Sequence, residues 1–143
     1  MNRISAISLC IAGLLASSSL MAGSVKTLAT IAANGGITID SKGDLYAAHF
    51  GVPGAPQGPR NVWKLSPTSA FAPFIFATGI IVGSGNDFDA QDNLFQSNFG
   101  GNRISRIDPA GNVTTFNSNV FGPIGIVIDE AGTLFVANCN ANT

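Results

Sequence analysis

The stretch that decides the fold is "GIVIDEAGTLFVANC", residues 125–139, because its pattern occurs three times in this chain. It aligns without gaps with "GITIDSKGDLYAAHF" (36–50) and with "GNDFDAQDNLFQSNF" (85–99). In each copy a Gly leads, an Asp follows four residues later, and a Leu with an aromatic neighbour comes five residues after the Asp. Self-similarity at such a period is typical of repeat architectures.

Each copy predicts two β-strands joined by a tight turn. The residues on both sides of the turn alternate or are β-branched and aromatic, which is strand patterning rather than helix patterning. Asp40 and Asp129 can cap the turn with their side chains, and Gly43 and Gly132 can supply its left-handed position. The second copy has Asp92 there, and Asp is one of the few non-glycine residues that tolerate this conformation.

The second half of the unit also recurs, since "NVWKLSP" (61–67) matches "RISRIDP" (103–109). Four short strands in about 40 to 50 residues form a propeller blade. We therefore predict an all-β fold of four-stranded antiparallel meanders, with two full blades and half of a third in units at 34–78, 83–118 and 123–143. The predicted strands are 36–40, 44–49, 61–66 and 71–77 in the first blade, and 85–89, 93–98, 103–108 and 112–117 in the second.

The segments "GPIGIVIDEAGTLFVAN" (122–138) and "NRISRIDPAGNVTTF" (102–116) together resemble the NHL-type repeat of the TolB-like six-bladed β-propeller superfamily. The resemblance covers nearly all of residues 34–143. It implies an incomplete propeller, and we expect this chain to be an N-terminal fragment of a longer one. Assembly into a ring of copies and a short remnant are the alternatives. Such folds host binding, scaffolding and catalysis alike, so the resemblance says little about function.

Residues 1–22 have the features of a secretory signal. Arg3 precedes an apolar run from Ile4 to Leu15, which small residues follow as far as Ala22. The run is too short to span a bilayer comfortably, although a lone membrane anchor is the alternative. We expect a secreted or periplasmic mature chain without a membrane span. Its one cysteine, Cys139, cannot form an internal disulfide, and we predict a small buried residue there.

The net charge limits the possible partners. The formal charge is -1, and no run of Lys or Arg occurs, which argues against nucleic acid as a partner. We expect a protein or a small molecule to bind at the face of the central channel. Unpaired blade edges and exposed apolar faces would also favour self-association.

The ends of the second strands and the starts of the first strands should share that channel face, because strand direction alternates along a meander. His49, Asn98 and Asn138 end the second strands there. Gly35, residues 83–86 and Gly125 begin the first strands. Loops converge on the axis at this face, so we expect ligand-binding residues among these positions.

Three features there are candidates for binding. Asn86 and Asp87 form a polar pair where the other copies have Ile37-Thr38 and Ile126-Val127. Such a departure in one repeat indicates function, unless the pair bonds to buried backbone groups. His49, the one histidine, could be a general base, a metal ligand or a hydrogen-bonded residue at the channel rim. The loop "FGVPGAPQGPRN" (50–61) is longer than "FGGN" (99–102) in the second unit, and it is either a binding loop or a spacer.

No nucleophile–base pair, metal cluster or G-x-S-x-G elbow occurs in the sequence, which favours a binding module with no catalytic residue and no cofactor. The alternative is a lactone hydrolase, because Asn86-Asp87 before "FDAQDNLF" resembles the gluconolactonase and senescence-marker family. That resemblance implies calcium or another divalent cation, with Asn86 and Asp87 as metal ligands. However, Gly35 stands where the family has a Glu, and the Asn-Asp pair comes two residues late. The amidating lyase propellers bind zinc through several histidines, and one histidine argues against them.

Overall fold

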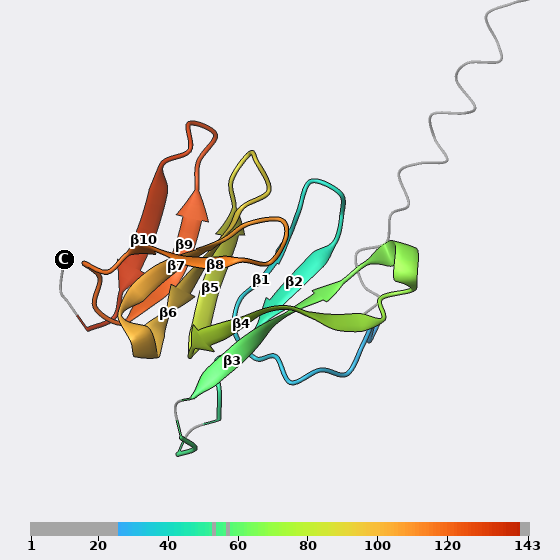
Figure 1. The fold of residues 1–143 in the computed structure, drawn as a ribbon, viewed down its shortest axis with the longest axis horizontal. Helices are drawn as coiled ribbons and strands as arrows, with labels where there is room; N and C mark the ends of the chain where they lie inside the picture. The colour runs from blue at the N-terminus through green and yellow to red at the C-terminus, as the bar shows by residue number, and fades with distance from the viewer. Residues whose placement is uncertain (1–25, 53, 57, 141–143) are drawn as a thin grey trace, which may run out of the picture.

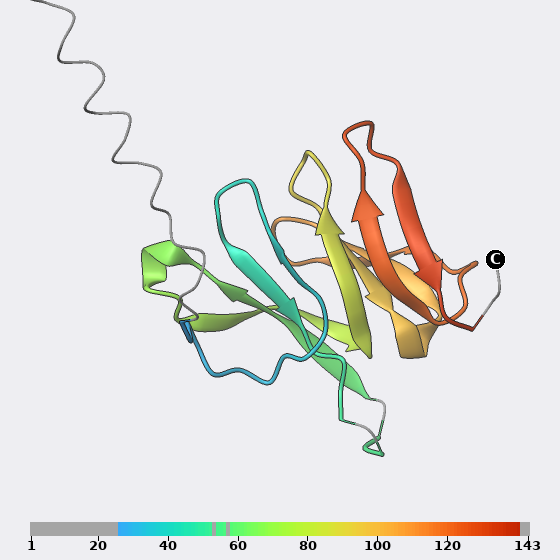
Figure 2. The same ribbon diagram turned by 180° about the vertical axis from the view of Figure 1, so that it is seen from behind.

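The computed structural model describes residues 26–52, 54–56 and 58–140, and the predicted signal at 1–22 lies outside this part of the chain. The described residues form three antiparallel sheets that lie side by side (Figures 1 and 2). The first sheet contains β1 (Ile37–Ile39), β2 (Leu45–Ala48), β3 (Pro59–Leu65) and β4 (Pro73–Ile81). The second contains β5 (Gly83–Phe88), β6 (Leu94–Asn98), β7 (Arg103–Ile107) and β8 (Val113–Asn117), and the third contains β9 (Pro123–Ile128) and β10 (Leu134–Asn138).

The strand order within each sheet follows the chain, β1-β2-β3-β4 and β5-β6-β7-β8. This is the four-stranded meander of a propeller blade, so the predicted fold class of two full blades and half of a third is confirmed. Two short 3-10 helices, η1 (Pro67–Ser69) and η2 (Phe99–Gly101), follow β3 and β6. No helix in the described ranges is long and apolar enough to cross a membrane.

The aspartate-capped turns between the first and second strands are confirmed. The Oδ1 atoms of Asp40 and Asp89 each accept two backbone N–H groups of their own turn, and Asp129 Oδ1 accepts the N–H of Thr133 at 2.7 Å. Each turn also has one residue in the left-handed region, where glycine is at no disadvantage and Asp is tolerated. These residues are Gly43, Asp92 and Gly132, with φ angles of 84°, 58° and 82°.

The outer half of the first blade is longer than the predicted strands. We predicted strands at 61–66 and 71–77, but β3 begins at Pro59 and β4 continues to Ile81. Pro59 pairs with Ile81 and Arg60 with Ile80, beyond a register shift between Arg60 and Val62. Gly79, with φ of 84°, adopts a conformation that permits such a bulge. The residues at the base of the long loop thus extend the pairing of β3 with β4. The pattern of either strand alone could not predict this extension.

Neighbouring sheets meet along their first strands, where the leading glycine of the repeat is required. Gly36 N donates to Ser84 O at 2.7 Å, and a Cβ on Gly36 would lie 2.5 Å from the same oxygen. A Cβ on Gly85 would come closer still to Ile124 O of the third sheet. Real Cβ atoms essentially never approach another atom within 3.0 Å, so these glycines allow the backbones of adjacent blades to touch.

The hydrophobic core lies between the sheets in two layers. The first layer joins four residues of the first sheet to Leu94 and Ile107 of the second. The second layer joins Phe95 and Ile104 to partly buried residues of the third sheet. Burial of these facing side chains is the main force that holds one blade on the next. The first-sheet members are Tyr46, Val62, Ala77 and Ile80, and the third-sheet members are Ile126, Ile128, Leu134 and Val136.

The prediction of a buried cysteine is wrong, because Cys139 is exposed. It follows the last residue of β10, and the paired residues Phe135 of β10 and Val127 of β9 are 54% and 55% exposed. Cysteine is usually buried because its surroundings cover it, and in the described part of the chain no further sheet covers β10.

Candidate functional site

The polar pair on the inner strand β5 is bonded mainly to the protein itself. Asp87 accepts the N–H of Phe88 on Oδ1 at 2.9 Å and the N–H of Ile128, in the third sheet, on Oδ2 at 2.8 Å. Asn86 Nδ2 donates to Gly36 O of the first sheet at 3.3 Å and to Gln96 Oε1 at 3.2 Å. The pair thus links all three sheets. This arrangement is the alternative in which the pair bonds to buried groups of the protein itself. Asn86 Oδ1 is buried without a partner in the described residues.

Gln96, which we did not single out from the sequence, is the centre of this polar cluster. Its side chain is fully buried, and Nε2 donates to the carbonyl oxygens of Ser84 and Gly85 at 3.1 and 3.0 Å. Buried side-chain amides in proteins are usually hydrogen-bonded, as Gln96 is here. Ala47 and Val136 hold the corresponding position in the other repeats. The same comparison that pointed to Asn86 would therefore have found Gln96.

The residues that end the second strands have different hydrogen-bond partners. Asn98 is fully buried, accepts the N–H of Ile81 at 3.0 Å, and donates to Gln96 O and to Ser105 Oγ. Asn98 therefore ties the end of β4 to the second sheet, next to the Asn86 cluster. Asn138 has the same place in the third sheet, but its Oδ1 is buried without a partner among the described residues.

His49 contacts the second sheet through its backbone. Its backbone N–H donates to Asn61 O at 3.2 Å, and its carbonyl accepts the N–H of Gly83 at 3.1 Å. The ring is half-buried, and it makes no hydrogen bond within the described residues. The role of His49 at the channel rim stays a prediction.

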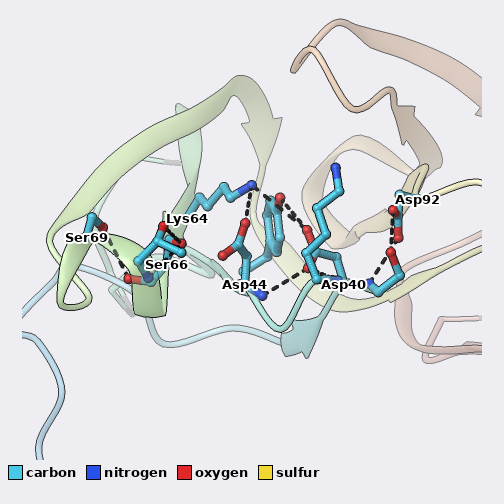
Figure 3. A network of polar contacts seen from close by, with 10 residues as sticks. Asp40, Asp44, Lys64, Ser66, Ser69 and Asp92 are labelled. Atoms are coloured by element: carbon cyan, nitrogen blue, oxygen red, sulfur yellow. Dashed lines mark hydrogen bonds and ion pairs between the residues drawn. The ribbon is translucent and has the colours of Figure 1, made fainter.

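A second polar network lies at the opposite end of the first blade, around the turn after β1 (Figure 3). Lys64 Nζ lies 2.6 Å from Asp44 Oδ2 and 5.0 Å from the ring centroid of Tyr46. Tyr46 donates its hydroxyl to Asp40 Oδ2 at 3.1 Å. The corresponding contact in the second blade is Arg106 to Asn93 Oδ1 at 2.7 Å. Since the same repeat positions make both contacts, this network stabilises a turn.

The pKa values in this network have identifiable physical causes. The hydrogen bond from Lys64 holds the pKa of Asp44 below its ordinary value of 3.8. Burial raises the pKa of Tyr46 to about 12. Burial by itself would lower the pKa of Lys64, but the hydrogen bonds to Asp44 and Tyr46 outweigh it and raise that pKa. At neutral pH the pair is therefore ionised and the tyrosine is neutral.

The donor atoms around Asn86 and Asp87 do not fit a calcium ion. Calcium takes six to eight oxygen ligands, commonly with several carboxylates. Here both carboxylate oxygens of Asp87 already accept backbone N–H groups, and Asn86 Oδ1 is the one uncommitted amide oxygen of the pair. Gly35 and Gly36 occupy the adjacent positions of the first sheet, which removes any side-chain ligand there. Among the described residues no three His, Cys, Asp or Glu side chains gather closely enough to hold a metal ion.

A cleft of about 190 Å³ lies beneath the long loop between β2 and β3, at the same end of the blades as His49. This volume is many times the ~10–15 Å³ that one water molecule needs. Asn34 fixes the start of the loop by accepting the N–H groups of Phe50 and Gly51 on Oδ1. The walls are mostly apolar, with one charged side chain. They include Phe50, Gly51, Val52, Pro56, Arg60 and Val82.

Val82, a residue that lines the cleft and joins β4 to β5, has an unusual backbone conformation. Its φ is 55°, which is rare for a β-branched residue and costs free energy. Its carbonyl accepts the N–H of Phe99 at 3.0 Å, and its side chain is buried. Surrounding contacts must outweigh the strain, and strained backbone of this kind often occurs next to binding sites.

Comparison with known proteins identifies the fold. No family model matches the chain, and no curated protein matches its sequence. A crystal structure of a protein named as a candidate gluconolactonase is similar over 71% of this chain, with a TM-score of 0.54 and 17% identity. Virginiamycin B lyase from Staphylococcus aureus is similar over 75% of the chain, with a TM-score of 0.47 and 13% identity.

The chain spans only part of these structures, 40% of the first and 49% of the second. At 17% identity the first comparison shows the fold alone. It bears out the predicted β-propeller fold, whereas membership of a superfamily and the NHL-type character of the repeat stay predictions. The sheet topology and this comparison lead to the same conclusion: the chain is built from blades of a β-propeller.

Proposed function

We propose that this chain is a secreted or periplasmic propeller module that binds a small-molecule ligand or a protein partner without catalysing a reaction. The cleft lined by residues 50–52 and 54–56, Arg60 and Val82 is the observation that carries the proposal. The polar side chains of β5 and β6 are largely bonded to one another and to the backbone. The cleft, by contrast, is open, and the charged side chain of Arg60 forms part of its lining. Concave, mostly apolar clefts with few polar groups are the usual form of ligand sites.

Screening by NMR tests this proposal. A library of small neutral and charged molecules is added to the ¹⁵N-labelled chain, and the perturbed backbone amides are mapped. We expect the perturbations to gather at residues 50–56 and Val82. The turns at residues 40–44 and 89–93, at the other end of the blades, provide an internal control (Figure 1). Hits that gather at these turns, or that spread over the whole chain, would contradict the proposal.

The calcium-dependent lactonase is not the function that we propose, because the donor atoms around Asn86 and Asp87 do not fit that cation. Calorimetric titration of the chain with calcium, zinc and manganese separates the two ideas. We expect no saturable heat. A saturable calcium signal that Asp87→Asn abolishes would restore the hydrolase.

Self-association is a second proposal, and it rests on the two end faces of the stack. Ile37 and Ile39 on β1 are 66% and 56% exposed, and Val127 and Phe135 on the last hairpin are exposed to a similar extent. Exposed apolar faces of packed sheets favour contacts with other chains. Sedimentation equilibrium should show association that Phe135→Ser weakens. Phe121, 59% exposed and outside the strands, supplies the control variant Phe121→Ser, which should have little effect.

A further inference from the structure

The charged group of the cleft, Arg60, has hydrogen-bonding capacity that the described protein does not use. Nη2 donates to Pro56 O at 2.8 Å, and Nε is buried without a partner among the described residues. No acidic side chain of the described chain lies within ion-pair distance of this guanidinium. An arginine remains charged at any physiological pH, so the guanidinium cannot become neutral by losing a proton.

The position of Arg60 in the cleft distinguishes it from a second arginine with the same bonds. Arg103 also donates Nη2 to a backbone carbonyl, that of Gly79 at 3.3 Å, and its Nε is likewise buried without a partner. The unused Nε therefore does not mark a site by itself. Arg60 differs because it lines the cleft, and Gly51 leaves space beside its Nε, where even an added Cβ would stay 4.0 Å away.

The walls of the cleft indicate what kind of anion would fit. Phe50, Val52, Pro56 and Val82 offer apolar surface, and Arg60 is the one charged residue among the lining positions. A guanidinium binds a carboxylate through two parallel N–H···O bonds, and the apolar walls suit a hydrocarbon part attached to it. Inorganic phosphate has no apolar part and carries more charge than one arginine balances.

We propose that this cleft binds a small organic acid, with Arg60 holding its carboxylate and the side chains of Phe50, Val52 and Pro56 covering its apolar part. The site deepens the proposed function and rests on it. Asn34 holds Phe50 and Gly51 at the start of the loop, and Pro56 O holds the guanidinium, so these groups need little further ordering on binding, which favours affinity.

The test uses the full chain labelled with ¹⁵N and follows the backbone amides of Gly51 and Val52 together with the Nε–H signal of Arg60. The probes are butyrate, butyramide as its neutral analogue of similar shape, and inorganic phosphate. We expect saturable shifts at these signals with butyrate and at least tenfold weaker effects with the other two. Charge-assisted hydrogen bonds contribute roughly 1.5–3 kcal/mol, which is the basis of that factor.

Variants separate the role of Arg60 from a general charge effect. Arg60→Gln should weaken butyrate binding at least tenfold, and Arg60→Lys should also weaken it, because an ammonium lacks the planar fork. Arg103→Gln is the matched control and should leave binding unchanged. Thermal unfolding of each variant confirms that it folds, and Arg60→Lys serves the test if Arg60→Gln does not.

Three outcomes would overturn the inference: equal binding of butyramide, tighter binding of phosphate, or an equal loss of binding in Arg103→Gln. The result also separates this inference from the proposed function. Neutral molecules that bind in the cleft would leave the binding module intact and remove only the organic acid. Ligands that bind elsewhere on the chain would remove both.

Discussion

Tyr46, Phe95 and Phe135 hold the same place in the three repeats, but their environments differ. Tyr46 and Phe95 are 3% and 7% exposed, whereas Phe135 is 54% exposed. All three lie on the second strand of a hairpin with the same pairing to its first strand. The repeat therefore sets the strand and the direction of the side chain, and the neighbouring sheet decides whether that side chain is buried.

The two junctions between sheets also differ in their chemistry. At the first, Tyr46 makes edge-to-face contacts with Phe76 and Phe88, at centroid distances of 4.8 and 4.9 Å. At the second, Phe95 packs in a cluster whose third-sheet members are aliphatic. Both junctions keep the close backbone approach at the leading glycine. The geometry of the stack is thus conserved between the junctions, while the side chains that fill it vary.

The largest effect should come from truncating the aromatic residue of the repeat where it is buried, with the exposed copy as the comparison. Phe95→Ala removes a buried ring that also packs edge-to-face on Phe116 at 4.9 Å, and it should lower the free energy of unfolding by about 3–5 kcal/mol. Phe135→Ala should change that free energy by less than about 1 kcal/mol, because the ring is already exposed to water. Urea unfolding of both variants measures the difference. Equal losses would show that Phe135 is covered in solution.

The next largest effect concerns the leading glycines. Gly85→Ala places a methyl group against the backbone of Ile124, which cannot move aside cheaply, and should cost about 1–3 kcal/mol. Gly125→Ala is the matched control, since the nearest atom to a Cβ there is the Ala137 Cβ at 3.6 Å. We expect Gly125→Ala to be neutral or slightly stabilising in urea unfolding. A destabilised Gly125→Ala together with a neutral Gly85→Ala would contradict the close approach of the second and third sheets.

Acid should affect the first hairpin more than the third. Because the pKa of Asp44 is lower in the folded chain than in the unfolded one, the unfolded chain binds more protons as the pH falls through 3.8 and below. Stability is therefore present at neutral pH and is lost in this acidic range. The third repeat has Thr133 at the same position, which does not titrate.

The variant Asp44→Asn checks this assignment by unfolding experiments between pH 6 and pH 3. It should be less stable than the unmodified chain at pH 6, and its stability should decline less steeply toward pH 3. The same slope in both proteins would mean that other carboxylates carry the acid dependence.

The smallest effect should come from the bridge between the first two turns. Ser41 donates its hydroxyl to Asp92 Oδ2 at 2.7 Å and its backbone N–H to Oδ1 at 3.1 Å, which lowers the pKa of Asp92. Ala90 holds the corresponding place in the second repeat and has no hydroxyl to donate. Ser41→Ala should cost less than about 1 kcal/mol, because the contact is exposed to solvent. A larger loss in urea unfolding would mean that the turns, rather than the apolar layers, hold the first two blades together.

Much of the fold could be predicted because it depends on local patterns. The capped turns follow from Asp40, Asp89 and Asp129, and the strands around them follow from alternation over a few residues. The extension of β3 and β4 could not be predicted, since it depends on a bulge and on pairing across the long loop. The expected burial of Cys139 failed for a similar reason, because burial depends on a neighbouring sheet.

The candidate site was predictable only in part. The sequence indicated Asn86, Asp87 and the long loop, but their roles depend on distant groups, such as the N–H of Ile128 that Asp87 accepts. Gln96 was within reach of the repeat comparison, whereas the importance of Arg60 was not. Nothing in "GPRNV" shows that no acidic side chain of the described chain lies within ion-pair distance of its guanidinium.

The sequence by itself determined the blade, because a repeat of glycine, alternating strand and aspartate turn specifies local hydrogen bonds and the direction of each side chain. Only the tertiary structure decided which residues of each blade are buried, hydrogen-bonded or exposed. The approach of neighbouring sheets made the leading glycines Gly36 and Gly85 necessary. It also buried Tyr46 and Phe95 but not Phe135, and bonded the polar groups of β5 and β6 to one another. It left the Arg60 guanidinium without an acidic partner among the described residues, in an open cleft. The reason is physical: strand patterns act over a few residues, whereas burial and pairing depend on atoms that the chain brings together from far apart.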